Sequence, residues 1–156
     1  MSETHKTIIS DTSCFIVLQN IGALDLLREV YGEVITTETV AEEFGEELPE
    51  WVKIESPKDK IKQILLELQI DKGEASAIAL ALEKQNVTVI LDDQKARKVA
   101  EKLALEVTGT LGGIVKAKNK TIIPSIKSLL DKLLQTNFHL SKAIEAEALK
   151  QANEQS

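Results

Sequence analysis

Short apolar runs alternate with helical stripes along this chain. The runs at residues 6–10, 34–35, 87–91 and 105–108 have the length and composition of buried strands. Residues 51–55 alternate apolar and polar side chains, which is typical of a strand at the edge of a sheet. Strands that alternate with helices predict an α/β fold, a three-layer α/β/α sandwich with a mainly parallel sheet of about five strands.

Between these strands, apolar residues recur every three or four positions, as they do on one face of a helix. The most regular of these patterns is an Ala-rich helix that begins at 71–74. The segment 58–69 is clearly amphipathic, and its apolar stripe consists of Ile61, Ile64, Leu65 and Leu68. The other predicted helices lie at 14–20, 23–31, from 36–39 to about 47, and at 95–103, 110–117, 125–134 and 140–152.

The length of 156 residues favours a single domain. We assign it to residues 1–140, followed by a C-terminal helix and a frayed tail at 141–156. The chain is 43% hydrophobic but only 3% aromatic, so its core must consist mainly of Ile, Leu, Val and Ala. No run reaches the ~18 apolar residues of a membrane span, and the polar start, including His5, does not resemble a secretory signal.

Cys14 is the single cysteine, which excludes an intrachain disulfide and fits a reduced, cytoplasmic location. It lies in an apolar run, so we expect a buried small side chain and not a nucleophile. The net charge of −6 opposes simple binding to a phosphate backbone. The charge is uneven, however, because residues 94–132 contain nine basic and three acidic residues. These lysines form either a basic face beside an acidic pocket or merely solvated helix surfaces.

Carboxylates close the apolar runs, and this is the most informative feature of the chain. In a parallel sheet the strand ends and the starts of the following helices share one edge, where ligands usually bind. The acids expected at that edge are Asp11, Glu42, Glu43, Glu74, Asp92 and Asp93.

Most of these acids also have a structural role available to them when taken alone. Asp11 suits a helix N-cap, although the hydroxyls of Thr12 and Ser13 serve that purpose equally well. Thr39 and Glu42 have the spacing of a capping box, which leaves Glu43 as the better metal-side candidate. Glu74 lies in the first turn of its helix, where an acid interacts favourably with the helix dipole.

Taken together, the acids predict a cation. Two like charges ~4 Å apart repel by roughly 4 kcal/mol at an effective dielectric of about 20, so several converging carboxylates need a positive charge between them. Oxygen ligands without histidine favour Mg²⁺ or Mn²⁺. We hypothesise that Asp11 and Asp93 hold the ion, that Glu74 and Glu43 complete the site, and that basic residues after Asp93 hold the substrate.

Four segments together resemble PIN domains. They are Ile8–Ser13, Thr39–Phe44, Gly73–Ala81 and Leu91–Ala100, which contain Gly-Glu-Ala and Asp-Asp-x-x-Ala-Arg elements. The following Val107–Gly113 looks like the subgroup found as the toxin in toxin–antitoxin pairs. The resemblance covers about residues 6 to 140. One departure is Thr37, where relatives often carry Pro.

The resemblance implies a parallel sheet of about five strands, a Mg²⁺ or Mn²⁺ site and endonuclease activity on RNA. Residue by residue, it implies that Asp11, Glu43, Glu74 and Asp93 are the four catalytic acids. It makes Asp92 an additional ligand. The accessory residues are Ser13, Thr12 and Glu42, and the candidate substrate-binding residues are Lys95, Arg97 and Lys98.

Two alternatives compete with a nuclease. A phosphatase that forms an aspartyl phosphate needs a second Asp two residues after the first, where this chain has Ser13. A catalytically weak module would act instead by pairing with an antitoxin or with itself. The apolar faces of 23–31 and 58–69 would then supply the interface.

Overall fold

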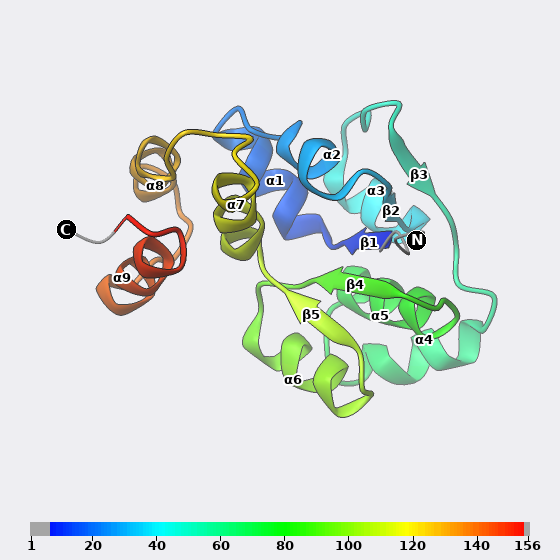
Figure 1. Ribbon diagram of the computed structural model, residues 1–156. Helices are drawn as coiled ribbons and strands as arrows, with labels where there is room; N and C mark the ends of the chain where they lie inside the picture. The colour runs from blue at the N-terminus through cyan, green and yellow to red at the C-terminus, as the bar shows by residue number, and fades with distance from the viewer. Residues whose placement is uncertain (1–6, 155–156) are drawn as a thin grey trace, which may run out of the picture.

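The computed structural model of the protein describes residues 7–154. His5, at the predicted polar start, and residues 155–156 of the predicted tail lie outside this range. Five parallel strands form one sheet in the order β3-β2-β1-β4-β5, with helices on both faces (Figure 1). The predicted α/β/α sandwich with a five-stranded parallel sheet is therefore confirmed. The strands are β1 (Thr7–Ser10), β2 (Val34–Thr36), β3 (Val52–Ile54), β4 (Val87–Ile90) and β5 (Glu106–Thr108).

The helices divide between the two faces of the sheet, as Figure 1 shows. On one face, α1 (Thr12–Asn20), α2 (Leu26–Tyr31), α3 (Glu38–Phe44) and α7 (Thr110–Asn119) contribute side chains to the main core. On the other face, α5 (Lys72–Leu82) and α6 (Gln94–Lys102) form a second core, to which α4 (Lys60–Glu67) adds Leu66. The C-terminal helices are α8 (Lys127–Leu134) and α9 (Lys142–Gln151).

Side-chain alternation along the strands accounts for the two cores. In β1, Ile8 faces the main core and Ile9 faces the second one. In β4, Ile90 faces the main core, whereas Val87 and Val89 face the second core. A strand buried on both faces must be apolar throughout, because successive side chains point to opposite sides of the sheet.

The start of α2 and the end and cap of α3 differ from those predicted from the sequence. Residues 23–25 form a turn before α2, in which the amide of Leu26 donates to the carbonyl of Ala23. The third helix ends at Phe44 and not near Glu47, because Gly45 takes a left-handed conformation with φ of 75°. It is capped by Thr37, whose hydroxyl accepts from the Val40 amide at 3.1 Å, so the capping box predicted from Thr39 is wrong.

The C-terminal helices belong to the packed structure. Ala148 of α9 and Ala152 just after it are buried in the main core, and Leu129, Leu130 and Leu133 of α8 are buried with them. The carboxylate of Glu154 accepts from the Ile126 amide at 2.8 Å, directly before α8. Every helix within residues 7–154 is too short or too polar to span a membrane.

Candidate functional site

The carboxyl ends of the strands bring the predicted acids to one edge of the sheet. Asp11 follows β1, Asp92 and Asp93 follow β4 by one residue, and Thr110 follows β5. The strands are all parallel, so these positions share one edge, and the first turn of α5 with Glu74 lies there too. The sequence-based expectation of a common edge is met by the topology.

Asp11 is the most unusual of these acids, because its side chain is buried and the whole residue is only 1% exposed. Its Oδ1 accepts from the Cys14 amide at 2.9 Å, so it is indeed the N-cap of α1. The pKa of Asp11 is raised to about 8, chiefly by burial and also by the charges of Asp92 and Glu74, although the capping hydrogen bond from Cys14 acts in the opposite direction. A cap needs neither burial nor neighbouring acids, so capping alone does not account for this residue.

Glu43, and not Glu42, is the acid of α3 that faces Asp11. The Thr12 hydroxyl donates to Glu43 Oε1 at 2.6 Å, whereas Glu42 lies outside the residues that line the acidic pocket. This pocket has a volume of about 250 Å³. The pocket is called the acidic pocket below, and it is lined by Asp11, Thr12, Ser13, Glu43, Asp71, Lys72 and Glu74.

Gly73 makes room for the Glu43 carboxylate. A Cβ atom at Gly73 would overlap Glu43 Oε1 and would lie 3.0 Å from Thr12 Oγ1. A larger residue must therefore push the end of the Glu43 side chain out of the acidic pocket.

We expect Gly73→Ala to lower catalytic activity about tenfold and to leave the fold intact. The displaced group is the end of a flexible side chain, and Ala favours a helix more than Gly does, which offsets part of the lost Thr12–Glu43 hydrogen bond. The measurement is cleavage rate beside melting temperature. An active Gly73→Ala variant would show that the position of Glu43 is unimportant.

Glu74 is half buried at the start of α5. Its Oε1 accepts from the Asp71 amide at 3.3 Å, so the predicted role in the first turn is correct. Burial raises its pKa to about 7, and the charges of Asp93, Asp71 and Glu43 act in the same direction against that hydrogen bond. The pKa of Glu74 is therefore raised by acids from α3 and from the end of β4, which are far apart in the sequence.

The adjacent acids Asp92 and Asp93 have different partners. Asp92 accepts from the Thr110 amide at 2.9 Å and from its hydroxyl at 2.6 Å, which ties the end of β4 to the start of α7. Asp93 is exposed and caps α6 by accepting from the Ala96 amide at 3.0 Å. Arg97 donates to the Leu91 carbonyl at 3.1 Å and so braces the same loop. The sequence pattern did not identify Thr110 as a site residue, because only the fold brings it close to Asp92.

A second and larger hollow, the groove, adjoins the acidic pocket and shares Ser13 with it. It has a volume of about 780 Å³ and runs from Asp92, Asp93 and Arg97 to the segment between α8 and α9. That segment contributes Phe138 and His139. Nothing in their local pattern signals this position, because it depends on where α9 packs.

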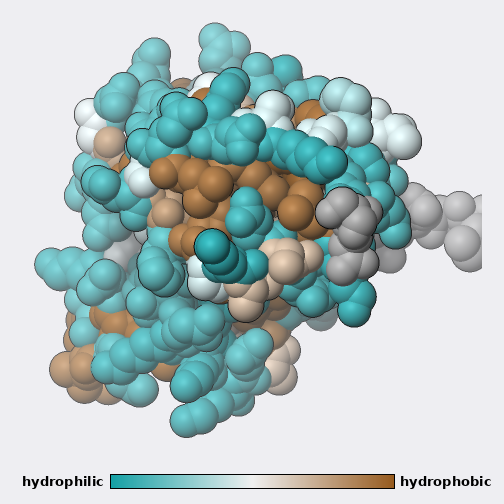
Figure 2. Space-filling view, turned by 90° about the vertical axis from the view of Figure 1, so that its left-hand side faces the viewer, coloured by the Kyte–Doolittle hydropathy of each residue, from teal (hydrophilic) through white to brown (hydrophobic). Residues whose placement is uncertain are grey.

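The groove is partly apolar. Ile144 of α9 lines it and is 47% exposed. Figure 2 looks at the side of the molecule that carries α8 and α9 and shows hydrophobic surface framed by hydrophilic side chains. Of the three predicted substrate-binding residues, Arg97 lines the groove, whereas Lys95 and Lys98 are exposed on α6 outside it.

The donor set at the edge suits a hard divalent cation, because its carboxylate and hydroxyl groups offer only oxygen ligands. Asp11 in particular is buried beside other acids, and its charged form is costly unless a cation is near. Among residues 7–154, however, no three Asp, Glu, His or Cys side chains lie close enough to hold one ion as they stand. An ion bound here would therefore take one or two of these carboxylates and keep water in its other ligand positions, as Mg²⁺ commonly does.

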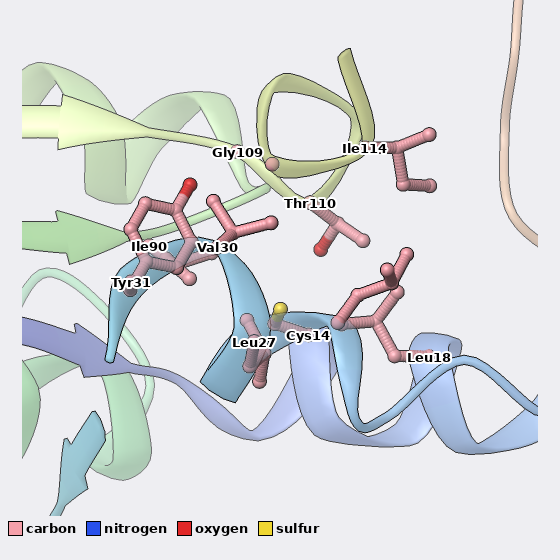
Figure 3. A pocket seen from close by; sticks show the side chains of 11 residues that line it. Cys14, Leu18, Leu27, Val30, Tyr31, Ile90, Gly109, Thr110 and Ile114 are labelled. Atoms are coloured by element: carbon pink, nitrogen blue, oxygen red, sulfur yellow. The ribbon is translucent and has the colours of Figure 1, made fainter. Parts of the chain in front are cut away.

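Cys14 is fully buried, as predicted, and lines a separate cavity of about 10 Å³, large enough for at most one water. Figure 3 shows Cys14, Leu27 and Thr110 facing this cavity from α1, α2 and α7. Burial raises the pKa of the thiol far above its usual value, and the charge of Asp11 adds to the effect. Cys14 is thus a core residue and not a nucleophile.

Comparison with protein families gives a match over nearly the whole described chain. A family model described as a PIN domain covers residues 7–154. The match includes α8 and α9 as well as the sheet and the acidic pocket. No curated protein matches the chain.

Proposed function

The chain belongs to the PIN-domain family, whose members are generally nucleases, and on that premise we propose that it is a metal-dependent endoribonuclease. It hydrolyses phosphodiester bonds of RNA at the carboxyl edge of the sheet, with Mg²⁺ or Mn²⁺. The observation that carries the proposal is Asp11, a buried acid whose pKa is raised by burial and by acids from two other parts of the chain. Such a group is typical of functional sites.

The ligands of the ion are assigned from the acidic pocket and the groove. Asp11 and Asp93 hold it, with Asp92 nearby, and Glu74 and Glu43 complete the site directly or through water. When bound, a divalent ion supplies a water of lowered pKa and offsets the negative charge of the scissile phosphate.

The remaining residues position these acids. Thr12 donates to Glu43 and directs its carboxylate into the acidic pocket. Thr110 holds both oxygens of Asp92. The caps made by Asp11 and Asp93 fix their side chains on the first turns of α1 and α6. Such supporting hydrogen bonds are what keep ligands oriented when a metal site forms.

RNA binds in the groove as a single strand. Phe138 offers a ring for stacking on a base, and Arg97 offers a positive charge to a phosphate. Ser13, shared by the groove and the acidic pocket, marks where the strand meets the acids. Lys95 and Lys98 contact the backbone beyond the groove. This arrangement gives a protein of net charge −6 a local means of binding RNA.

Metal removal tests the proposal. We expect purified protein to cleave the single-stranded segments of a structured RNA with Mn²⁺, to lose at least about 99% of that rate in EDTA, and to recover it with excess Mn²⁺ or Mg²⁺. A bound ion contributes several kcal/mol to stabilisation of the transition state. The measurement is the cleavage rate of an end-labelled RNA. A rate that is the same with and without EDTA contradicts the metal-dependent mechanism.

A toxin role with an antitoxin partner, in the cytoplasm, is the biological setting we propose for this activity. The alternative is a module that acts mainly by pairing with another protein. The exposed apolar face of α4 favours pairing with another protein under both the toxin role and the alternative. The second apolar face predicted from the sequence, on α2, is buried in the main core and is not available for pairing.

A further inference from the structure

Helix α4 presents its apolar stripe to solvent. Ile61 is 70% exposed, Ile64 58%, Leu65 57% and Leu68 79%. The helix packs on α5 through the opposite side, where Leu66 is buried. Figure 1 places α4 at the periphery of the molecule, next to α5. Four large apolar residues on one exposed helix face are far more than the scattered surface residues of an ordinary monomer, and such patches mark association surfaces.

The stripe has the spacing of a helix-pairing seam. Residues 61, 64, 65 and 68 follow the i, i+3, i+4, i+7 pattern, so all four point to one side. In heptad terms Ile61 and Leu68 occupy equivalent positions one repeat apart, with Ile64 between them. A second helix with the same stripe fits against it by interdigitating side chains.

Charges beside the stripe favour an identical partner in the antiparallel direction. Lys60 and Glu67 are seven residues apart, so they lie on the same flank of the stripe, one at each end of the helix. Glu67 accepts from Gln63 at 3.1 Å within the helix. A two-fold axis perpendicular to both helices brings each Lys60 opposite the Glu67 of the other copy, twice in one dimer. A parallel pair would place Lys60 opposite the apolar Leu65 instead.

We propose that a second copy of this chain docks on α4, with the two α4 helices antiparallel and with two Lys60–Glu67 pairs between the copies. The apolar stripes form the centre of this interface and the charge pairs form its rim, as in ordinary protein interfaces. This proposal does not depend on nuclease activity. The C-terminal end of α4 leads directly to Asp71 and Lys72 of the acidic pocket, so the partner copy lies near the rim of each site.

Molar mass by light scattering or analytical ultracentrifugation tests the proposal. We expect the wild-type chain to be a dimer and Ile64→Glu to raise its dissociation constant at least about a hundredfold, because Ile64 lies midway between Lys60 and Glu67 and a charge there is buried in the apolar centre. Leu103→Glu, at another exposed apolar residue, is the matched control and stays dimeric. A wild-type monomer at high concentration overturns the proposal, and so does an Ile64→Glu variant that dimerises normally.

Charge reversal tests the direction of the helices. Lys60→Glu and Glu67→Lys each place like charges opposite one another and raise the dissociation constant about tenfold, since each dimer has two such pairs. The double variant restores the pairs with opposite polarity and recovers dimerisation. If the double variant is as weak as the sum of the single variants, the antiparallel arrangement is wrong. Circular dichroism and melting temperature confirm that every variant is folded.

Discussion

Replacing Asp11 by Asn is expected to lower RNA cleavage at least about a hundredfold while the protein stays folded. Asn retains a side-chain oxygen that accepts from the Cys14 amide, so the N-cap of α1 survives. It removes the negative charge that holds the ion, and loss of about 3 kcal/mol of transition-state stabilisation corresponds to a factor of about one hundred. The measurement is the cleavage rate with Mn²⁺ at equal protein concentration.

Glu42→Gln is the matched control for this experiment. Glu42 is an exposed acid of the same edge, one residue from Glu43, and it lies outside the acidic pocket. The control should cleave at the wild-type rate. Cleavage by Asp11→Asn at the wild-type rate would identify the activity as a contaminating nuclease and remove the proposed function, but it would leave the α4 dimer untouched.

The second large expected effect is a loss of stability as the pH rises. The pKa of Asp11 is about 8 in the folded protein, whereas an unfolded Asp has a pKa near 3.9. Between these values the folded state holds a proton that the unfolded state has released. The free energy of unfolding therefore falls as the pH rises from about 4 to about 8, by up to ~1.4 kcal/mol per pH unit, and becomes independent of Asp11 above that.

Over this range the loss amounts to several kcal/mol in metal-free protein. Glu74 acts in the same direction, because its pKa is raised to about 7. The measurement is urea unfolding in EDTA at pH 5, 6, 7 and 8, compared with Asp11→Asn, which should show a much smaller slope. Parallel pH profiles for the two proteins would show that Asp11 is not a buried acid of raised pKa.

Mn²⁺ should reverse this trend, because ligands must be deprotonated to bind a metal. The increase in stability on adding Mn²⁺ should therefore grow between pH 5 and pH 8. Asp11→Asn should show little of this increase at any pH, which separates specific binding at the acidic pocket from general effects of the ion on the surface.

The hydrophobic pattern identified the strands of the sheet well, because a strand with helices on both faces of its sheet must be apolar on both sides. A run such as 87–91 is too short for a buried helix and too apolar for a loop. It identified helix ends less well. Gly45 ends α3 by adopting a left-handed conformation that neighbouring residues rarely allow, and a stripe-based prediction continued past it. The N-cap of α3 could not be predicted from the sequence either. Thr37 and Thr39 are both suitable N-cap residues, and only the backbone conformation in the folded protein shows that Thr37 is the cap.

The acids were predictable as a group but not as individuals. Their common edge follows from strand order and direction, which alternation of strands and helices already implies. The distinction between Glu42 and Glu43 depends on helix rotation by one residue, and the Thr12 hydroxyl that marks Glu43 is 31 positions away in the chain. From the sequence, a helix cap and a metal ligand were alternative roles for Asp11. In the structure Asp11 caps α1 and is also buried, as acids at functional sites often are.

The order of strands and helices, the parallel sheet and the gathering of carboxylates at one edge were determined by the sequence alone, because each follows from local hydrophobic pattern and from the direction of the strands. Tertiary structure alone decided which side chains meet and which stay in water. It brought Phe138 and His139 to the groove beside Asp92, and it left the stripe of α4 exposed while burying the similar stripe of α2. The physical reason is that periodicity shows a helix has an apolar face, but only the packing of neighbouring elements determines what covers it.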